Sequence, residues 1–383
     1  KICRSLYQLP EVKGECQEME IRIKEGLKLV QKLDERAMVQ AKKRWDSVAK
    51  PLNSLGLLEE AVIKIAGIQK TPDVNLNKKA VVICCGDNGI VEEGVTQTGQ
   101  EVTAIVTENF TRGESCVCLM AKQAGAKVFP IDLGVAAELS GTQKTFPDGD
   151  GPICIWDRKI RMGTSNFLHG PAMSRNQAEE AVETGILAVC NLKKQGYSLI
   201  ATGEMGIGNT TASSAVVSVL LGVPPETVTG RGAGLDSKGL SRKIQVIKEG
   251  IEKNRPNLSD GLDVLAKVGS FDLAGLTGVI IGGAIYRIPV VLDGFISGAA
   301  ALAAASICPE ISDFLLASHV SAEPAGKMVL DALGLKPAIY GNMCLGEGTG
   351  AVAFFPLLDM ACTVYHQMST FQEIDVKEYE HLL

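Results

Sequence analysis

Short apolar segments rich in β-branched residues alternate with longer amphipathic segments from about residue 80 onward. In the longer segments, apolar positions recur every three or four residues, which is typical of helices that cover a sheet. The short segments are continuously apolar, as expected of strands buried on both faces of a parallel sheet. The segments expected as strands are residues 80–85, 127–135, 197–202, 288–295 and 313–319.

Both ends of the chain show a different, purely helical pattern. Residues 18–49 and 50–67 have apolar positions at helical spacing and many charges, and residues 354–373 form a closing amphipathic segment. The polar, proline-containing segment 69–79 reads as a linker. We therefore expect an α/β fold, with a Rossmann-like parallel sheet flanked by helices in a large catalytic domain. The predicted division is a small helical domain, 1–68 with 357–383, and a large domain, 69–356.

Composition narrows the range of partners. Among 383 residues, charged residues make up 21%, aromatic residues make up 5%, and the net charge is −6. A nucleic-acid binder would normally be basic, so no nucleic-acid partner is expected. The longest apolar run, residues 295–308, is shorter than the roughly 20 residues that span a bilayer. No membrane partner is expected either.

The cysteines and histidines show no metal-binding spacing. The 11 cysteines include no CxxC pair, and the four histidines form no cluster with them. We therefore expect no metal and no cofactor, and we expect free thiols in a reducing cytoplasm.

Three loops follow predicted strands and precede helices, which is where open parallel sheets bind ligands. They are CGDNGI after residue 84, GEMGIGNTT (203–211) and DGF (293–295). In the second loop, Gly206 and Gly208 permit close approach of the backbone, and Asn209 and Thr210 are able to donate to an anion. A tight turn with an asparagine helix cap explains this loop equally well. The loop lacks the Walker A and dinucleotide-binding patterns, which disfavours NTP hydrolysis and NAD binding.

Two later segments add candidate nucleotide contacts. GRGAGLD (230–236) is followed by Lys243, and its Arg231 and Lys243 are suited to neutralise a phosphate. A flexible loop with solvated charges is the competing interpretation. In HVSAEP (319–324), Ser321 is favoured as a helix cap, with Glu323 in the first turn.

Two glutamates stand in glycine-rich loops: Glu204 in GEMGIGNTT and Glu347 in LGEGTGA (345–351). A carboxylate repels phosphate, so neither loop is a simple phosphate cradle. Paired carboxylates indicate a site of proton transfer or glycosyl chemistry.

Taken in order, these motifs resemble the nicotinate-nucleotide–dimethylbenzimidazole phosphoribosyltransferase family. The resemblance runs from about Lys50 to about Gln372. Besides the loops above, PVVLDGF, GDNGIVEEGV, NFTRGES and MGTSNF carry it. It implies transfer of phosphoribose from nicotinate mononucleotide to an aromatic base, 5,6-dimethylbenzimidazole or a relative, in cobamide synthesis. It also implies a homodimer.

The resemblance assigns roles to individual residues. Glu347 is implied as the general base, and Glu204 supports catalysis in the same pocket. Gln100 is implied beside the acceptor, and Met205 is expected to shape the acceptor pocket. The residues implied to hold the nucleotide are Gly206, Gly208, Asn209, Thr210, Lys243, Ser321 and Gly346.

Three departures from the family pattern leave alternatives open. Asn88 replaces a histidine in GDHG, residues 50–56 read KPLNSLG instead of KPPGSLG, and Cys344 replaces an arginine. One alternative is the same transfer to a phenolic acceptor. Another is a non-catalytic subunit that pairs with a homologous chain in a heterodimer. Because Glu204 and Glu347 are both present, the sequence argues against an inactive subunit.

Overall fold

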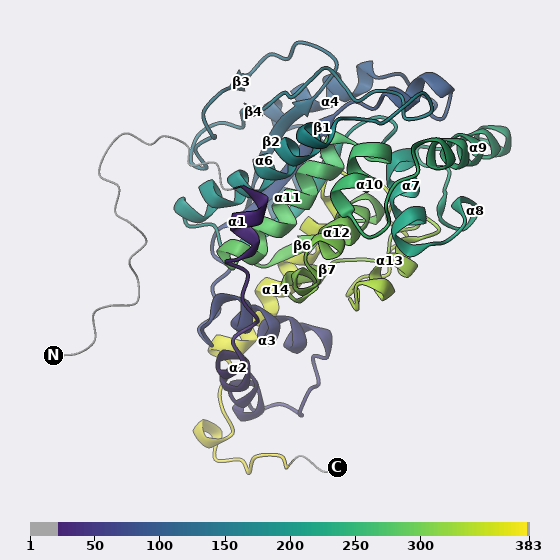
Figure 1. The fold of residues 1–383 in the computed structure, drawn as a ribbon. Helices are drawn as coiled ribbons and strands as arrows, with labels where there is room; N and C mark the ends of the chain where they lie inside the picture. Colours follow the sequence, from purple (N-terminus) through teal and green to yellow (C-terminus); the bar gives the residue numbers. More distant parts are fainter. Residues whose placement is uncertain (1–21, 381–383) are drawn as a thin grey trace.

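The computed structural model describes residues 22–380, and within them seven parallel strands form one sheet flanked by helices (Figure 1). The strand order is β3-β4-β2-β1-β5-β6-β7. This arrangement confirms the expected α/β class. The strands are β1 (Lys79–Gly86), β2 (Ala126–Gly134), β3 (Thr142–Gln143), β4 (Ile155–Asp157), β5 (Leu199–Met205), β6 (Val290–Leu292) and β7 (Leu315–Ala317).

All five expected strands are present, and two more were not predicted. The strands β3 and β4 contain only two and three residues, too few to show a pattern. The strands β6 and β7 contain only three residues each, and both ends of each predicted segment lie outside the sheet. Central β1 is fully buried and pairs with β2 on one side and β5 on the other.

The helices and helical turns are α1 (Ile23–Leu27), α2 (Glu35–Ser47), α3 (Leu57–Gln69), η1 (Gly89–Glu93), α4 (Glu101–Arg112), α5 (Cys116–Gln123), α6 (Arg175–Lys194), α7 (Asn209–Leu221), α8 (Pro225–Val228), α9 (Ser237–Asn254), α10 (Gly261–Val268), α11 (Phe271–Tyr286), α12 (Phe295–Ile307), η2 (Pro309–Phe314), α13 (Gly326–Ala332), α14 (Thr349–Gln367) and η3 (Gln372–Ile374).

Side chains of β1 alternate between two apolar cores. Val82 and Cys84 face the core formed with α6, α7 and α10–α12, whereas Val81 and Ile83 face the core formed with α2, α3, α5 and α14. A sheet covered on both faces explains why its strands are uniformly apolar.

Glycines bring α6 and α11 into close contact. A Cβ at Gly185 would lie 2.6 Å from the Val279 nitrogen, and one at Gly278 would lie 2.7 Å from the Val182 carbonyl carbon. Part of the high glycine content therefore serves helix packing rather than ligand loops. The predicted capping box on α6 is confirmed: the Ser174 hydroxyl and the Gln177 side chain bond reciprocally to each other's backbone N–H.

The helical pattern expected across residues 18–49 is interrupted in the structure. Residues 28–34 separate α1 from α2, and Asp34 caps α2 by accepting from the Ala37 N–H at 2.8 Å. The part of the prediction before residue 22 lies outside the described residues. Because Asp34 caps a new helix, the helical spacing of apolar residues does not correspond to one helix here.

Segments from both ends of the chain pack together. Figure 1 shows α2 and α3 at the lower end of the molecule, beside the C-terminal end of α14. The Trp45 and Tyr365 rings lie 5.1 Å apart, and Arg44 Nε donates to the Tyr365 carbonyl at 3.1 Å. In contrast, α1 contacts α6 and α11. The predicted division into two domains stays a prediction.

The altered turn at residues 50–56 keeps the backbone shape that a glycine would favour. Asn53 stands where the family pattern has glycine, and its φ is 55°. Asparagine is one of the few residues that tolerate this left-handed conformation. None of the helices in residues 22–380 is long and apolar enough to span a bilayer.

Candidate active site

A cavity of about 190 Å³ lies at the carboxyl ends of β5, β6 and β7. Neighbouring parallel strands end at the same edge of the sheet, so the loops that follow them converge there. Ten of the eleven predicted site residues line this cavity, and Gln100 does not. The ten are Glu204, Met205, Gly206, Gly208, Asn209, Thr210, Lys243, Ser321, Gly346 and Glu347.

Glu204 is the penultimate residue of β5, and its side chain is almost fully buried. Its carboxylate Oε2 accepts a hydrogen bond from Asn209 Nδ2, and the same nitrogen donates to Asp272 Oδ2 at 2.8 Å. Burial raises the pKa of Glu204 to about 8, and the charge of Asp272 contributes. Burial also raises the pKa of Asp272, to about 6, although the Ser270 hydroxyl donates to it.

The loop between β5 and α7 allows this arrangement because of its glycines. A Cβ on Gly206 would collide with the Gly86 carbonyl oxygen, and Gly208 has a φ of 94°. Asn209 is the first residue of α7, and its side chain bonds to two carboxylates instead of capping the helix. The asparagine-cap interpretation of this loop is therefore wrong.

Glu347 lies in a turn in which three successive residues adopt left-handed backbone conformations. The φ angles of Gly346, Glu347 and Gly348 are 99°, 59° and 97°. Glu347 Oε2 accepts from the Val117 N–H at 3.3 Å, at the N-terminus of α5. Burial raises the pKa of Glu347, and the Val117 N–H opposes that effect.

Asp293 follows β6 directly and holds the Glu347 turn in place. Its Oδ1 accepts from the Gly350 and Ala351 N–H groups at 2.7 and 3.1 Å, and its Oδ2 accepts from Gly348 at 3.2 Å. The residue that caps α14, Gly348, has no side chain to satisfy these N–H groups, so Asp293 satisfies them from a neighbouring strand. Burial raises the pKa of Asp293 to about 7.

Lys243 also lines the cavity. It is 1% exposed, and its Nζ donates to Thr210 Oγ1 at 2.8 Å. Burial lowers the pKa of Lys243 to about 8. The nearby Arg231 instead folds onto its own loop and donates to the Leu235 carbonyl at 2.7 Å. A buried ammonium beside the start of α7 provides a positively charged position for an anion.

The predicted cap at Ser321 is wrong, although the residue lies in the cavity wall. The helix α13 begins five residues later, at Gly326, and carries no side-chain cap. Ser321 Oγ accepts from the Glu323 N–H at 3.3 Å within the preceding turn.

Gln100 lies next to the site without lining it. Its Nε2 donates to the Asn88 carbonyl at 3.0 Å, and Asn88 Nδ2 in turn donates to the Ile207 carbonyl at 3.2 Å. Thr103 Oγ1 accepts from the Ile207 N–H at 3.0 Å. Gln100, Asn88 and Thr103 thus support the loop that follows Glu204. Cys344, the third departure from the family pattern, is exposed and lines the cavity.

Sequence reasoning missed three buried polar residues of the site, Asp272, Asp293 and His319. The loop containing Asp293 was recognised by its position after a strand, but the aspartate itself was not singled out. Nothing in the local sequence around Asp272 indicates its role, because its partner Asn209 is 63 residues away. His319 lines the cavity with its Nδ1 3.0 Å from the Ser318 hydroxyl.

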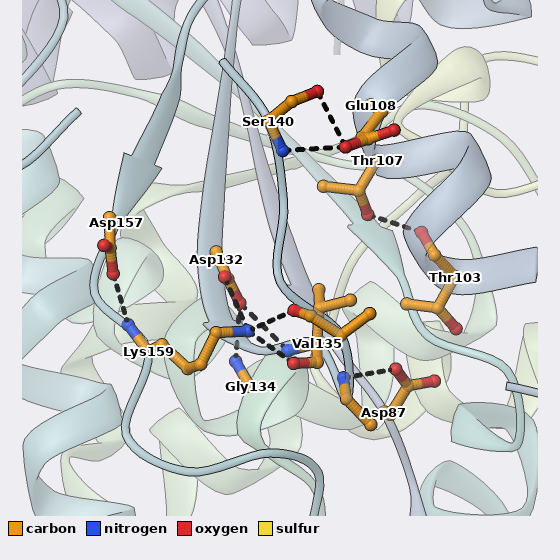
Figure 2. Close-up of polar contacts among 12 residues, drawn as sticks. Asp87, Thr103, Thr107, Glu108, Asp132, Gly134, Val135, Ser140, Asp157 and Lys159 are labelled. Carbon is orange, nitrogen blue, oxygen red and sulfur yellow. Dashed lines mark hydrogen bonds and ion pairs between the residues drawn. The ribbon is translucent and has the colours of Figure 1, made fainter. Parts of the chain in front are cut away.

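A second group of buried acids lies at the same edge of the sheet, outside the cavity lining (Figure 2). Asp132 Oδ2 pairs with Lys159 Nζ at 2.9 Å, and its Oδ1 accepts from the Gly134 and Val135 N–H groups. Asp87 Oδ2 accepts from the Ala136 N–H at 2.7 Å. Burial raises the pKa of both carboxyls, and Lys159 opposes the shift in each. Across residues 22–380, no group of three or more His, Cys, Asp or Glu side chains has an arrangement suited to a metal ion.

Comparison with known proteins defines the class of this site. A sequence model described as phosphoribosyltransferase matches residues 30–376. The chain is therefore a phosphoribosyltransferase, which is a class of glycosyltransferase.

The individual relatives specify the family. The nicotinate-nucleotide–dimethylbenzimidazole phosphoribosyltransferase of Ruminiclostridium cellulolyticum is 46% identical over 358 residues, covering 94% of this chain and 99% of the relative. The enzyme of the same name from Clostridium acetobutylicum is 45% identical, covering 94% and 100%. The chain belongs to this family, as the sequence motifs indicated.

A solved structure agrees with this assignment. The crystal structure of CobT from Thermus thermophilus has a TM-score of 0.83 at 40% identity, covering 90% of this chain and 100% of that one. The hypotheses of a phenolic acceptor and of a non-catalytic subunit gain no support from the names of these relatives.

Proposed function

We propose that this chain transfers phosphoribose from nicotinate mononucleotide to 5,6-dimethylbenzimidazole or a related base, giving an α-linked ribotide and nicotinate for cobamide synthesis. The observation that carries the proposal is one cavity with Glu204 and Glu347 in its wall and the buried ammonium of Lys243 in the same lining. Such a cavity offers a position for a phosphate and a position for proton transfer. The names of the related enzymes supply the substrates.

In this proposal, Lys243 and Thr210 hold the phosphate at the start of α7. Their existing contact places an ammonium and a hydroxyl together, and the first turn of α7 adds its positive dipole end. The other proposed nucleotide contacts are Gly206, Gly208, Asn209, Ser321 and Gly346. Because Asn209 Nδ2 already donates to Glu204 and Asp272, we expect it to act through these carboxylates.

The proposed reaction exchanges one carbon–nitrogen bond for another. An unprotonated ring nitrogen of the base attacks the anomeric carbon, while the bond from that carbon to the nicotinate nitrogen breaks. The leaving nitrogen keeps the bonding electron pair and becomes a neutral pyridine, so no acid is required. The base then carries a positive charge, and Glu347 accepts the proton from its other ring nitrogen.

The local geometry of Glu347 suits this proton transfer. Its carboxylate lies at the cavity wall, and burial raises its pKa toward that of a neutral-pH base. We propose Met205 as an apolar wall of the acceptor position. Gln100 does not reach the cavity lining in this conformation, so its predicted contact with the acceptor requires its bond to the Asn88 carbonyl to break.

A product assay tests the proposal. The purified chain is incubated with nicotinate mononucleotide and an equimolar mixture of dimethylbenzimidazole, benzimidazole, adenine, phenol and p-cresol, and the ribotides are separated. We expect benzimidazole ribotides together with stoichiometric nicotinate. If only phenolic ribotides formed, the acceptor would be a phenol instead of a benzimidazole. Absence of any product would contradict the proposal. The homodimer and the cytoplasmic location also stay predictions, and sedimentation analysis tests the former.

A further inference from the structure

Asp272 is a buried acid in contact with the site that the reaction above does not use. It has no measurable exposure, and both of its oxygens accept hydrogen bonds from side chains. Ser270 Oγ donates to Oδ1, and Asn209 Nδ2 donates to Oδ2 at 2.8 Å. Donors directed at both oxygens favour the ionised form of a carboxyl group.

Glu204 is supplied with fewer donors. Its Oε2 accepts from Asn209, whereas its Oε1 accepts no hydrogen bond from the described residues. Oε1 lies against the turn that carries Glu347, since a Cβ on Gly346 would collide with it. Glu204 and Gly346 both line the cavity, and a proton on Oε1 would leave the bond between Oε2 and Asn209 undisturbed.

The groups around Glu204 leave its charge uncompensated. Asp272 on α11, Asp293 after β6 and Glu347 before α14 are acids, and β1 contributes the thiols of Cys84 and Cys85. No lysine or arginine in residues 22–380 forms an ion pair with Glu204 or Asp272. Two buried carboxyls bridged by one amide nitrogen, with no cation, hold a shared proton more easily than two charges.

We propose that Asp272 is a positioning residue that keeps the shared proton on Glu204 Oε1, so that Glu204 meets the nucleotide as a neutral O–H donor. The inference rests on the proposed function for the identity of that nucleotide. Asp272 then carries the negative charge that stabilises the developing cation at the anomeric carbon. Glu204 donates to an oxygen of the nucleotide and does not compete with Glu347 for the proton of the base.

Infrared titration of the full chain detects the proton on Glu204 and does not depend on turnover. Protein made with ¹³C-carboxyl glutamate shifts the glutamic-acid carbonyl band away from that of the aspartates, and Glu204→Gln identifies the Glu204 band. In the wild type we expect this band at neutral pH and its loss only under alkaline conditions. In Asp272→Asn, we expect the pH at which half of the Glu204 band is lost, its titration midpoint, to fall by about one pH unit or more. The reason is that a neighbouring negative charge has been removed.

Two further variants keep the test decisive. Ser270→Ala removes a donor from Asp272, moves the proton toward that residue and lowers the Glu204 midpoint by a smaller amount, which serves if Asp272→Asn does not fold. Asp87→Asn changes an equally buried acid outside the cavity and leaves the midpoint unchanged. Absence of the Glu204 band at neutral pH, or an unchanged midpoint in both site variants, would overturn the inference. Failure of the product assay overturns the proposed function instead.

Discussion

Two groups of buried acids lie at the carboxyl edge of one sheet, and they differ in how their charge is balanced. In the first group, Asp132 in β2 pairs with Lys159 and accepts from the Val135 N–H, and Asp87 after β1 accepts from the Ala136 N–H. Glu204 and Asp272 share one asparagine nitrogen, and no cation pairs with either of them in the described chain. Both groups are equally buried, so burial alone does not distinguish them.

The difference indicates what each group contributes. The acids of the Asp132 group hold the backbone in place. Lys159, which pairs with Asp132, also donates to the Val135 carbonyl and so fixes the loop after β2 (Figure 2). The acids of the Glu204 group face a cavity, and burial raises the pKa of Glu204 to about 8. Perturbed carboxyls without cations are costly for stability and are typical of reactive sites.

The largest expected effect is on turnover. We predict that Glu347→Gln lowers kcat by about 100-fold or more, because a general base contributes on the order of 10²–10⁴. Binding of nicotinate mononucleotide, measured by calorimetry, should persist. Glu108 is a partly exposed glutamate on α4 that accepts from Ser140, outside the cavity lining. Glu108→Gln is therefore the matched control and should keep wild-type turnover. Near-full activity of Glu347→Gln would remove the general-base role.

Substitutions in the Asp132 group should change the stability of the protein instead of its turnover. We predict that Lys159→Met lowers the free energy of unfolding by about 3 kcal/mol, because it leaves the Asp132 carboxylate, 1% exposed, without its cation. Urea denaturation measures the change. Lys144→Met breaks the neighbouring ion pair between Lys144 and Asp157. Because the Lys144 side chain is 83% exposed, this variant should lower the free energy of unfolding by no more than about 1 kcal/mol. Equal effects of the two variants would contradict the comparison.

A smaller effect concerns how stability depends on pH. The folded pKa of Glu204, about 8, is above its ordinary value of 4.5, so the folded protein holds a proton that the unfolded chain releases. This contribution is fully present below about pH 4.5 and is lost as the pH rises to about 8. Relative to Glu204→Gln, the wild type should therefore lose stability at about 1.4 kcal/mol per pH unit inside this window. Parallel stability curves for the two proteins would show that Glu204 does not titrate this way.

The smallest predicted change is in affinity. Lys243→Ala should weaken binding of nicotinate mononucleotide about tenfold, as expected from loss of one charge-assisted contact to phosphate. Lys238→Ala provides the control on the exposed side of the same helix, α9. An unchanged dissociation constant for Lys243→Ala, measured by calorimetry, would take Lys243 out of the nucleotide site.

Much of the fold was predictable because its signals are local. The five longer apolar segments indicated a buried parallel sheet, and the capping box marked the start of α6. The strands β3 and β4 were missed because two or three residues are too few to show a pattern. The break before α2 was missed as well. Periodicity over residues 18–49 did not reveal that Asp34 begins a new helix.

The site was predictable to the extent that its residues stand in recognisable loops. Glu204 and Glu347 were found because a carboxylate in a glycine-rich loop is difficult to explain by packing. Asp272 escaped because it lies at the start of an apolar helix and meets Asn209 only in the folded chain. Asp293 was likewise invisible as the support of Glu347, since it caps a helix 55 residues further on.

The most direct test is the rate of ribotide formation per folded molecule in the wild type, Glu204→Ala and Lys159→Met, with dimethylbenzimidazole as acceptor. We predict that the wild type forms the ribotide, that Glu204→Ala, which removes the O–H donor, is slower by about 100-fold, and that Lys159→Met retains the wild-type rate despite its lower stability. No ribotide from the wild type, or a slow Lys159→Met beside a fully active Glu204→Ala, would contradict this account.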